Sequence, residues 1–251
     1  MSSRVRTGIA GLDQMIGGGL PEGYCYLVLG GPGAGKTTFG VQYLVNGILD
    51  HKETGVYVTL DEPPHSVVNN MRDGFGWDLL SLEARLQLAI VDAFPAEMDV
   101  PAKRFRVKGA LGTEEFSLDA VLGLVSEAKR RVQPAMKRCV IDSISSLIYQ
   151  YESTFRQRQQ VLRLMKGLTE MRLTTLLLGE LPEETIDYQR FGPEAFLTQG
   201  VFVMHNVRIR NTITQVFQIK KLRGQQFPKD MVPYTIGSNG VEVFPGEKVF
   251  A

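Results

Sequence analysis

Short apolar runs and amphipathic stretches alternate along the first two-thirds of the chain. Apolar runs typical of buried strands occupy residues 24–29, 55–60, 86–91, 138–143 and 174–178. Between them, apolar residues recur at helical spacing over residues 38–49, 65–74, 117–132 and 155–172. Strands that alternate with helices are joined by crossovers and pair in parallel. The pattern therefore predicts an α/β fold with a mainly parallel sheet flanked by helices.

The C-terminal part of the chain has a different pattern. Strand-like runs follow one another there without an intervening helix, at residues 201–210, 213–222, 232–236 and 241–244. Polar turns separate the first two runs and the last two, and consecutive strands joined in this way pair antiparallel. We therefore expect an antiparallel extension of the sheet. Because the 251 residues contain no linker, repeat or low-complexity stretch, we expect residues 1–251 to form a single domain.

The composition is that of an ordinary globular protein, with 43% apolar and 22% charged residues. The net charge of +1 gives no general electrostatic reason to expect nucleic-acid binding. Cys25 and Cys139 lie inside apolar runs, as buried free thiols do. No apolar signal region begins the chain and no apolar run approaches ~18 residues. We expect a cytoplasmic protein without membrane contact.

A glycine-rich loop follows the first strand and precedes the first long helix. Its residues fit the phosphate-binding pattern of Gly, any four residues, Gly, Lys and then Ser or Thr. Glycines allow backbone N–H groups to turn inward around anionic oxygens, and the new helix adds its positive dipole end. Lys36 would reach the outer phosphates and Thr37 a magnesium ion. The predicted nucleotide-binding residues here are Gly31, Pro32, Gly33, Ala34, Gly35, Lys36, Thr37 and Thr38.

The apolar run at residues 138–143 is a predicted buried strand that ends in a carboxylate, Asp142. Many strands end in this way, but a carboxylate after a buried strand is also the second element of nucleotide sites of this kind, where it polarises magnesium-bound water. Coming after the glycine-rich loop in the right order, Asp142 joins Thr37 as the predicted magnesium site.

Several further motifs, in a fixed order, give the chain a family resemblance. They are Thr7-Gly8-Ile9, Gly11-Leu12-Asp13, Gly17-Gly18-Gly19-Leu20-Pro21, Asp61-Glu62, Phe75-Gly76-Trp77-Asp78, Ile141-Asp142-Ser143 and Lys221-Leu222-Arg223-Gly224. Together with the loop they resemble the KaiC family of RecA-like P-loop ATPases over nearly the whole chain. The resemblance implies ATP and Mg²⁺ as cofactors, a RecA-like P-loop NTPase fold and a homo-oligomeric, hexameric ring with active sites between subunits.

The resemblance also implies catalytic carboxylates. Asp61 and Glu62 match the pair that follows the second strand, one of which activates the attacking water in the family. A carboxylate near the γ-phosphate can orient water or accept its proton. The family usually has Glu at both places, so the shorter Asp61 leaves the two as equal candidates. A solvated acidic turn before Pro63 and Pro64 is the simpler interpretation of the same residues.

The last implied element is Lys221-Leu222-Arg223, which in the family reaches the nucleotide of the neighbouring subunit. Cations there would offset charge on the phosphoryl oxygens, so Arg223 joins Lys36, Asp61 and Glu62 as a predicted catalytic residue. The alternative is a solvated, charged face that protects an edge strand. Phe227 stands where the family often has His.

Two other functions remain open on the sequence. One is a DNA- or RNA-binding ATPase: residues 103–108 are basic with an aromatic, although residues 180–200 carry five acidic residues against one basic. The other is a nucleotide-binding signalling module with little hydrolysis, because Asp61 departs from the usual Glu. Ala195 and Phe196 occupy the positions of the family's autophosphorylation sites, so the same autokinase cycle is not predicted. We expect a further protein partner, which the sequence does not identify.

Overall fold

The computed structural model describes residues 3–93, 118–132, 136–181, 191–209, 211–247 and 249. Three sequence predictions lie outside these residues. They are the basic stretch 103–108, residues 182–190 of the acidic segment and Ser117, the first residue of the helix predicted over residues 117–132.

Nine strands form one sheet in the order β11-β10-β9-β8-β3-β7-β6-β4-β5. Strand pairs from β8 to β5 are parallel, and β8, β9, β10 and β11 pair antiparallel with one another in turn. A separate small sheet joins β1 to β2. The strand bounds are β1 Arg4–Val5, β2 Leu20–Pro21, β3 Cys25–Gly30, β4 Gly55–Thr59, β5 Leu88–Asp92, β6 Arg138–Asp142, β7 Thr174–Glu180, β8 Gly200–Ile209, β9 Thr212–Leu222, β10 Val232–Gly237 and β11 Gly240–Val243.

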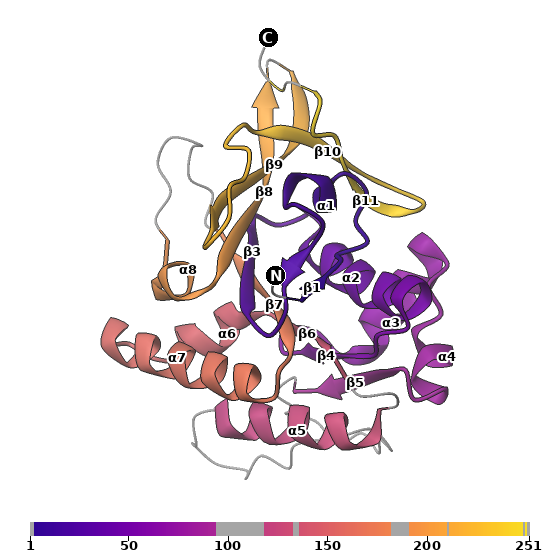
Figure 1. Cartoon of the computed structure of the whole chain (residues 1–251), viewed down its shortest axis with the longest axis vertical. Coiled ribbons are helices and arrows are strands. Elements are labelled where there is room, and N and C mark those ends of the chain that lie inside the picture. Colours follow the sequence, from indigo (N-terminus) through magenta and orange to yellow (C-terminus); the bar gives the residue numbers. More distant parts are fainter. Residues whose placement is uncertain are drawn as a thin grey trace.

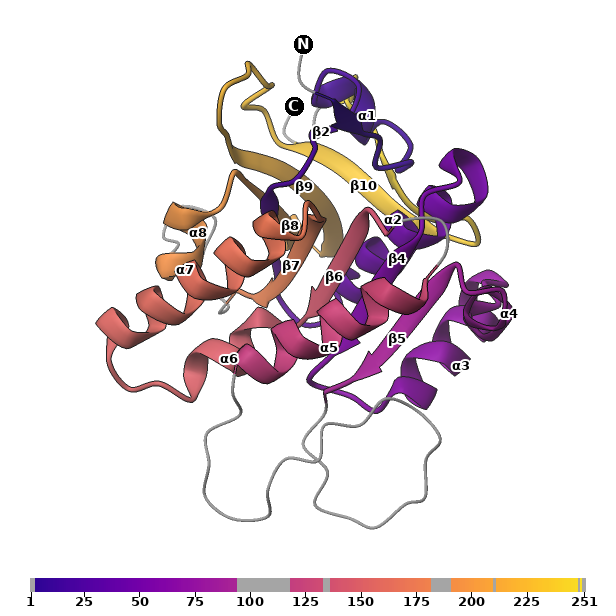
Figure 2. The same ribbon diagram turned by 60° about the horizontal axis from the view of Figure 1, so that its bottom comes forward.

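Helices cover both faces of the sheet, as Figures 1 and 2 show. One hydrophobic core lies under α1, α2, α3 and α4, and a second lies under α5, α6, α7 and α8. The helix bounds are α1 Leu12–Met15, α2 Lys36–His51, α3 Pro64–Phe75, α4 Leu79–Ala84, α5 Leu118–Arg131, α6 Ile144–Tyr149, α7 Thr154–Glu170 and α8 Pro193–Leu197. The mainly parallel sheet with flanking helices and antiparallel C-terminal strands confirms the predicted fold class.

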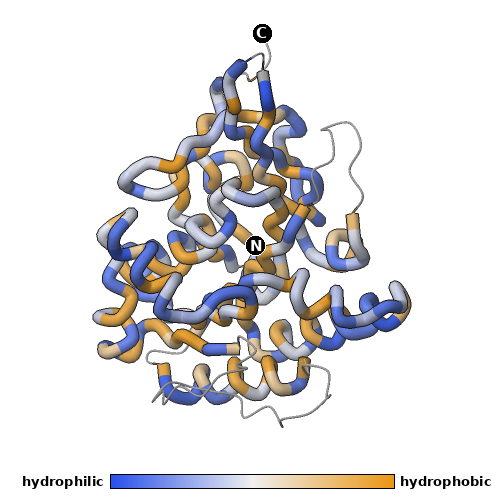
Figure 3. The backbone as a smooth tube through the Cα atoms, turned by 180° about the vertical axis from the view of Figure 1, so that it is seen from behind, coloured by the Kyte–Doolittle hydropathy of each residue, from blue (hydrophilic) through white to orange (hydrophobic). Residues whose placement is uncertain are grey.

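Side chains that alternate along the central strands fill the two cores. In β3, Tyr26 and Val28 face α2, while Leu27 and Leu29 face the α7 side. Strands buried on both faces read as continuous apolar runs, which explains why they were predictable. In Figure 3 the hydrophobic segments gather in the central strands and the hydrophilic ones along the outer helices. No helix among the described residues has the length and apolar character that a membrane crossing requires.

The C-terminal hairpin of β10 and β11 supports the glycine-rich loop and the helix after it. The Tyr234 hydroxyl donates to the Ala34 carbonyl at 2.7 Å. The Gln42 side chain both donates to the Val241 carbonyl and accepts from its N–H, at 3.0 and 2.6 Å. Residues two hundred positions apart in the chain are therefore tied together around the start of α2.

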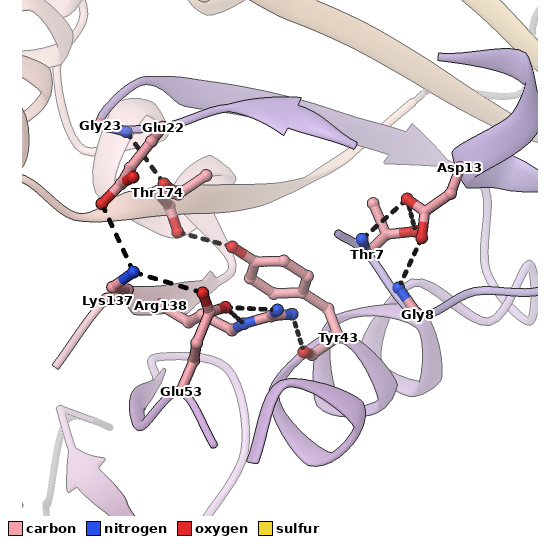
Figure 4. A network of polar contacts seen from close by, with 10 residues as sticks. All are labelled: Thr7, Gly8, Asp13, Glu22, Gly23, Tyr43, Glu53, Lys137, Arg138 and Thr174. Carbon is pink, nitrogen blue, oxygen red and sulfur yellow. Dashed lines mark hydrogen bonds and ion pairs between the residues drawn. The ribbon is translucent and has the colours of Figure 1, made fainter. Parts of the chain in front are cut away.

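Asp13 organises the N-terminal motif. Asp13 belongs to α1, and its carboxylate accepts hydrogen bonds from the Thr7 N–H, the Thr7 hydroxyl and the Gly8 N–H, at 2.8, 2.8 and 3.1 Å (Figure 4). The Gly8 carbonyl in turn accepts from Asn46 of α2 at 2.7 Å. The carboxylate thus closes a turn and attaches the N-terminal segment to the nucleotide-binding helix.

Three short helices were not predicted. Helices α4 and α6 span six residues each and α8 spans five, which is too few turns for an apolar period to be recognised.

Candidate functional site

A polar cleft lies at the carboxyl edge of the parallel strands. Because β3, β7, β6 and β4 are neighbours in the sheet, the residues that follow them meet at one edge. Their side chains line a cavity of about 170 Å³. The lining residues are Lys36, Thr37, Asp61, Glu62, Asp142, Ser143 and Glu180.

The glycine-rich loop leaves room where a phosphate would approach. Gly33 and Gly35 have φ angles of 71° and 87°, a region that favours glycine. A Cβ added to Gly31 or Gly33 would meet no atom within 4 Å, so this side of the loop is open. A Cβ on Gly35 would come within 2.3 Å of Ile236 Cδ1, so the other side is closed by β10. The loop therefore presents backbone to the cleft and is backed by packed protein.

Lys36 folds over the loop. Its Nζ donates to the carbonyls of Gly30 and Gly31, at 2.9 and 3.1 Å. Burial lowers the pKa of Lys36, and the charges of Asp142, Glu180 and Asp61 act in the opposite direction. Four carboxylates and one ammonium group line the cleft, so its side chains carry an excess of negative charge.

Thr37 and Asp142 meet as the magnesium prediction requires. The Thr37 hydroxyl and the Tyr57 hydroxyl both donate to Asp142 Oδ2, each at 2.7 Å. Burial raises the pKa of Asp142, while the two hydrogen bonds lower it. Among the described residues no three Asp, Glu, His or Cys side chains converge as a metal cage. A magnesium ion here would therefore depend on phosphate oxygens and water for most of its ligands, which is its usual behaviour.

Asp61 and Glu62 both line the cleft, and both are held by serines. The Ser146 hydroxyl of α6 donates to Asp61 Oδ1, and the Ser66 hydroxyl of α3 donates to Glu62 Oε2 at 2.8 Å. The Thr59 hydroxyl holds the backbone by donating to the Glu62 carbonyl at 2.5 Å. Both carboxylates remain candidates for the catalytic role.

Sequence reasoning did not select Glu180 or Ser143 for the site. Glu180 was counted only as part of an acidic segment, and Ser143 only as the last residue of the motif Ile141-Asp142-Ser143, with no role of its own. Glu180 ends β7 and Ser143 follows β6, and these parallel strands lie between β3 and β4, which is the signal that could have found both residues. The Glu180 N–H donates to the Ser145 hydroxyl at 2.8 Å, which holds the end of β7 against α6.

Lys221, Leu222 and Arg223 are not part of this cleft. The Arg223 N–H donates to the Gln199 carbonyl, and the Gln199 N–H donates to Cys25 at the amino end of β3. The loop begins at Gly30, five residues along β3, so about 17 Å of strand separates Arg223 from the loop. Within one chain the structure therefore does not bring these three residues together with the other predicted site residues.

The two cations are held instead by the end of α8. Lys221 Nζ donates to the carbonyls of Ala195 and Phe196, at 2.8 and 2.9 Å, and Arg223 Nη2 donates to Phe196 at 2.7 Å. Burial, together with the charge of Arg223, lowers the pKa of Lys221 to about 8. Leu222 is buried in the core under α2.

The chain is similar to proteins of one family. The family model "ATPase: KaiC" matches residues 5–248. The circadian clock oscillator protein KaiC of Synechococcus elongatus is 35% identical over 243 residues, which cover 97% of this chain and 44% of that protein. KaiC of Nostoc sp. is also 35% identical, over 96% of this chain and 44% of its own length. The chain thus spans less than half the length of these curated relatives.

A solved structure is similar over its whole length. The crystal structure of a KaiC-like protein from the hyperthermophilic archaeon Pyrococcus horikoshii OT3 superposes with a TM-score of 0.80 at 33% sequence identity. The match covers 98% of this chain and 100% of that one. The shared fold agrees with the predicted RecA-like P-loop architecture.

Proposed function

The chain belongs to the KaiC family of ATPases, and from this we propose that it binds Mg-ATP in the carboxyl-edge cleft and hydrolyses it within a ring of identical subunits. The observation that carries the proposal is the separation of two complementary half-sites. The cleft has the phosphate loop and an excess of carboxylates, and the cations suited to a phosphoryl transition state lie on the other edge of the same sheet.

The loop residues fit a triphosphate. The open sides of Gly31 and Gly33 allow phosphate oxygens to approach the backbone N–H groups at the start of α2. Lys36 needs only to exchange its two carbonyl partners for phosphate oxygens, a charge-assisted and stronger hydrogen bond. Because the lysine is half-buried, that exchange also compensates its lost hydration.

Thr37 and Asp142 fit a magnesium ion. The Thr37 hydroxyl donates its hydrogen bond to Asp142, so the lone pairs of its oxygen are free to face the cleft. Asp142 Oδ1 makes neither of the two hydrogen bonds at Oδ2 and can accept from metal-bound water. The bound nucleotide supplies the phosphoryl group and the metal neutralises its oxygens.

Hydrolysis further requires a group that orients water and a positive charge near the phosphoryl oxygens. We assign the first role to Asp61 or Glu62, which line the cleft on the side of β4. We assign the second to Arg223, with Lys221, of an adjacent subunit, because about 17 Å of strand keeps these cations from the cleft of their own chain. The end of α8 holds both cations in place at the surface that would face the neighbour.

The experiment that tests this proposal mixes two inactive variants. Arg223→Ala should keep its ATP affinity but lose roughly 10³-fold in turnover, the effect of removing an arginine finger. Asp61→Asn combined with Glu62→Gln should also be inactive. In mixtures, the first variant supplies an intact cleft and the second an intact Arg223, so activity should partly return. Lys220→Ala removes a neighbouring exposed lysine of β9 and serves as the matched control.

Turnover is measured over a range of mixing ratios, beside the solution mass with and without Mg-ATP. If no ratio restores activity, or if the mass remains that of a monomer, the assignment of Arg223 to a neighbouring site is wrong. Strong stimulation by single-stranded DNA or RNA in the same assay would favour the nucleic-acid-dependent ATPase instead.

A further inference from the structure

Ser143 is a buried hydroxyl without a partner. It lines the cleft directly after Asp142, its residue is 2% exposed, and its Oγ has no hydrogen-bond partner within the part of the chain that the structure describes. The hydroxyls around it are satisfied: Thr37 and Tyr57 bond to Asp142, and Ser145 accepts from Glu180. Ser143 thus differs from these neighbouring hydroxyls, each of which forms a hydrogen bond.

The usual structural role of a serine at this position is not used. Ser143 is the N-cap residue of α6, where serine commonly accepts a hydrogen bond from a backbone N–H of the first turn. Its side chain makes no such bond. Burying a hydroxyl without any partner is unfavourable, and an orphan of this kind in a native protein calls for an explanation.

The composition of the cleft explains why the Ser143 hydroxyl is left without a partner. The four carboxylates of the lining only accept hydrogen bonds when they are ionised. The Thr37 hydroxyl already donates its hydrogen bond to Asp142. Lys36 and Ser143 are therefore the side chains of the lining that can still donate a hydrogen bond to a ligand. Ser143 follows β6, between β7 with Glu180 and β4 with Asp61 and Glu62. It thus lies in the middle of an otherwise acidic wall.

We propose that Ser143 is a further residue of the nucleotide site, whose hydroxyl hydrogen-bonds an oxygen of the bound substrate. This inference rests on the proposed function. The oxygen would belong either to the terminal phosphoryl group or to the attacking water, the two reacting groups that the carboxylates of this wall are proposed to serve. In either case the hydroxyl gains, on binding, the partner that it lacks in the nucleotide-free protein.

The test compares two serines that lie two residues apart. Ser143→Ala removes an unpartnered hydroxyl, so the melting temperature of the nucleotide-free protein should stay the same or rise. Ser145→Ala removes the acceptor of the Glu180 N–H, so it should lower that temperature by about 2–4 °C, the shift expected for one buried hydrogen bond in a domain of this size. This readout separates a structural serine from a ligand-binding one without any activity measurement.

The second readout is the response to nucleotide. Ser143→Ala should lower turnover roughly tenfold to hundredfold. A weaker affinity for ATP with unchanged affinity for ADP would assign the hydroxyl to the terminal phosphoryl group. Unchanged affinities with reduced turnover would assign it to the attacking water.

The proposal is overturned if Ser143→Ala lowers the melting temperature of the nucleotide-free protein as Ser145→Ala does while ATP affinity and turnover stay unchanged. If Mg-ATP does not stabilise the wild-type protein and is not hydrolysed by it, the proposed function itself is wrong, and this inference with it.

Discussion

Arg138 and Lys36 are cationic side chains near carboxylates at opposite edges of the same sheet, and their surroundings differ. At the amino end of β6, Arg138 has a fully buried side chain with every branch of its guanidinium occupied. Its Nε and Nη2 donate to Glu53 at 2.9 and 2.6 Å, and its Nη1 donates to the Tyr43 carbonyl at 2.7 Å (Figure 4). The guanidinium also stacks on the Tyr43 ring at 4.5 Å. A Cβ on Gly47 would lie 2.2 Å from Arg138 Nε, so no space remains there for a ligand.

At the carboxyl edge, Lys36 has the opposite environment. It bonds to two backbone carbonyls and to none of the four carboxylates of its cleft, and the ion pairs found among the described residues do not include it. The cleft has empty volume, surplus negative charge and, at Ser143, a hydroxyl that finds no hydrogen-bond partner among the described residues. A polar cluster whose charges and hydrogen-bonding groups are all paired within the protein stabilises the fold. A cluster in which some of these groups are unpaired is a candidate ligand site.

The largest effect expected from this comparison is on stability. Arg138→Ala removes both guanidinium hydrogen bonds of Glu53, which keeps only the more distant Lys137 at 3.5 Å, and one donor to the Tyr43 carbonyl, so unfolding should cost about 3–5 kcal/mol less. Thermal or denaturant unfolding measures the loss. Arg163→Ala is the control, because its pair with Asp119 is 62% and 53% exposed and should contribute less than about 1 kcal/mol.

Equal losses for the two arginine variants would show that the Arg138 cluster contributes no more than a surface pair. The proposed distinction between the two edges of the sheet would then have no energetic basis.

The next effect in size is on nucleotide affinity. Lys36→Ala should weaken ATP binding by about 1.5–3 kcal/mol, roughly tenfold to 150-fold, because a charge-assisted hydrogen bond to phosphate is lost. The stability of the nucleotide-free protein should change far less than in Arg138→Ala. Titration calorimetry beside unfolding measures both, with Lys166→Ala, an exposed lysine of α7, as the control. Unchanged ATP affinity in Lys36→Ala would refute the assignment of the phosphate loop.

The same comparison explains what sequence reasoning could reach. Lys36 and Thr37 are recognisable because the loop needs these residue types at fixed local spacing, and the buried strands are recognisable by their apolar runs. Arg138 and Glu53 are 85 residues apart, and nothing local pairs them. The placement of Arg223 outside the cleft likewise follows from the strand order, in which β9 comes back antiparallel beside β8.

Residues with more than one ordinary role were the hardest to assign. The role of Asp13 could not be assigned, because its partners are backbone N–H groups and a hydroxyl of Thr7 and Gly8, whose positions depend on the folded turn. Ser143 and Glu180 end strands, and only the neighbouring order of β7, β6 and β4 brings them to the cleft. The loop residues could be inferred because their chemistry is local in sequence, whereas the roles of Glu180 and Ser143 were missed because the strand order brings them to the cleft.

The smallest predicted effect tests whether the negative charge of the cleft is in surplus. Glu180 is exposed and one of four carboxylates around Lys36, so Glu180→Gln should tighten the binding of ATP without Mg²⁺ by about 0.5–1 kcal/mol, roughly two- to fivefold. With Mg²⁺ the gain should shrink, since the metal offsets much of the same repulsion. High salt should reduce it as well, because exposed charges are screened. Glu170→Gln on α7 removes an equal charge away from the cleft and should change neither affinity. If Glu180→Gln instead weakens binding in the presence of Mg²⁺, Glu180 takes part in holding the metal-bound nucleotide, and the carboxyl edge contains one more binding residue than we assign to it.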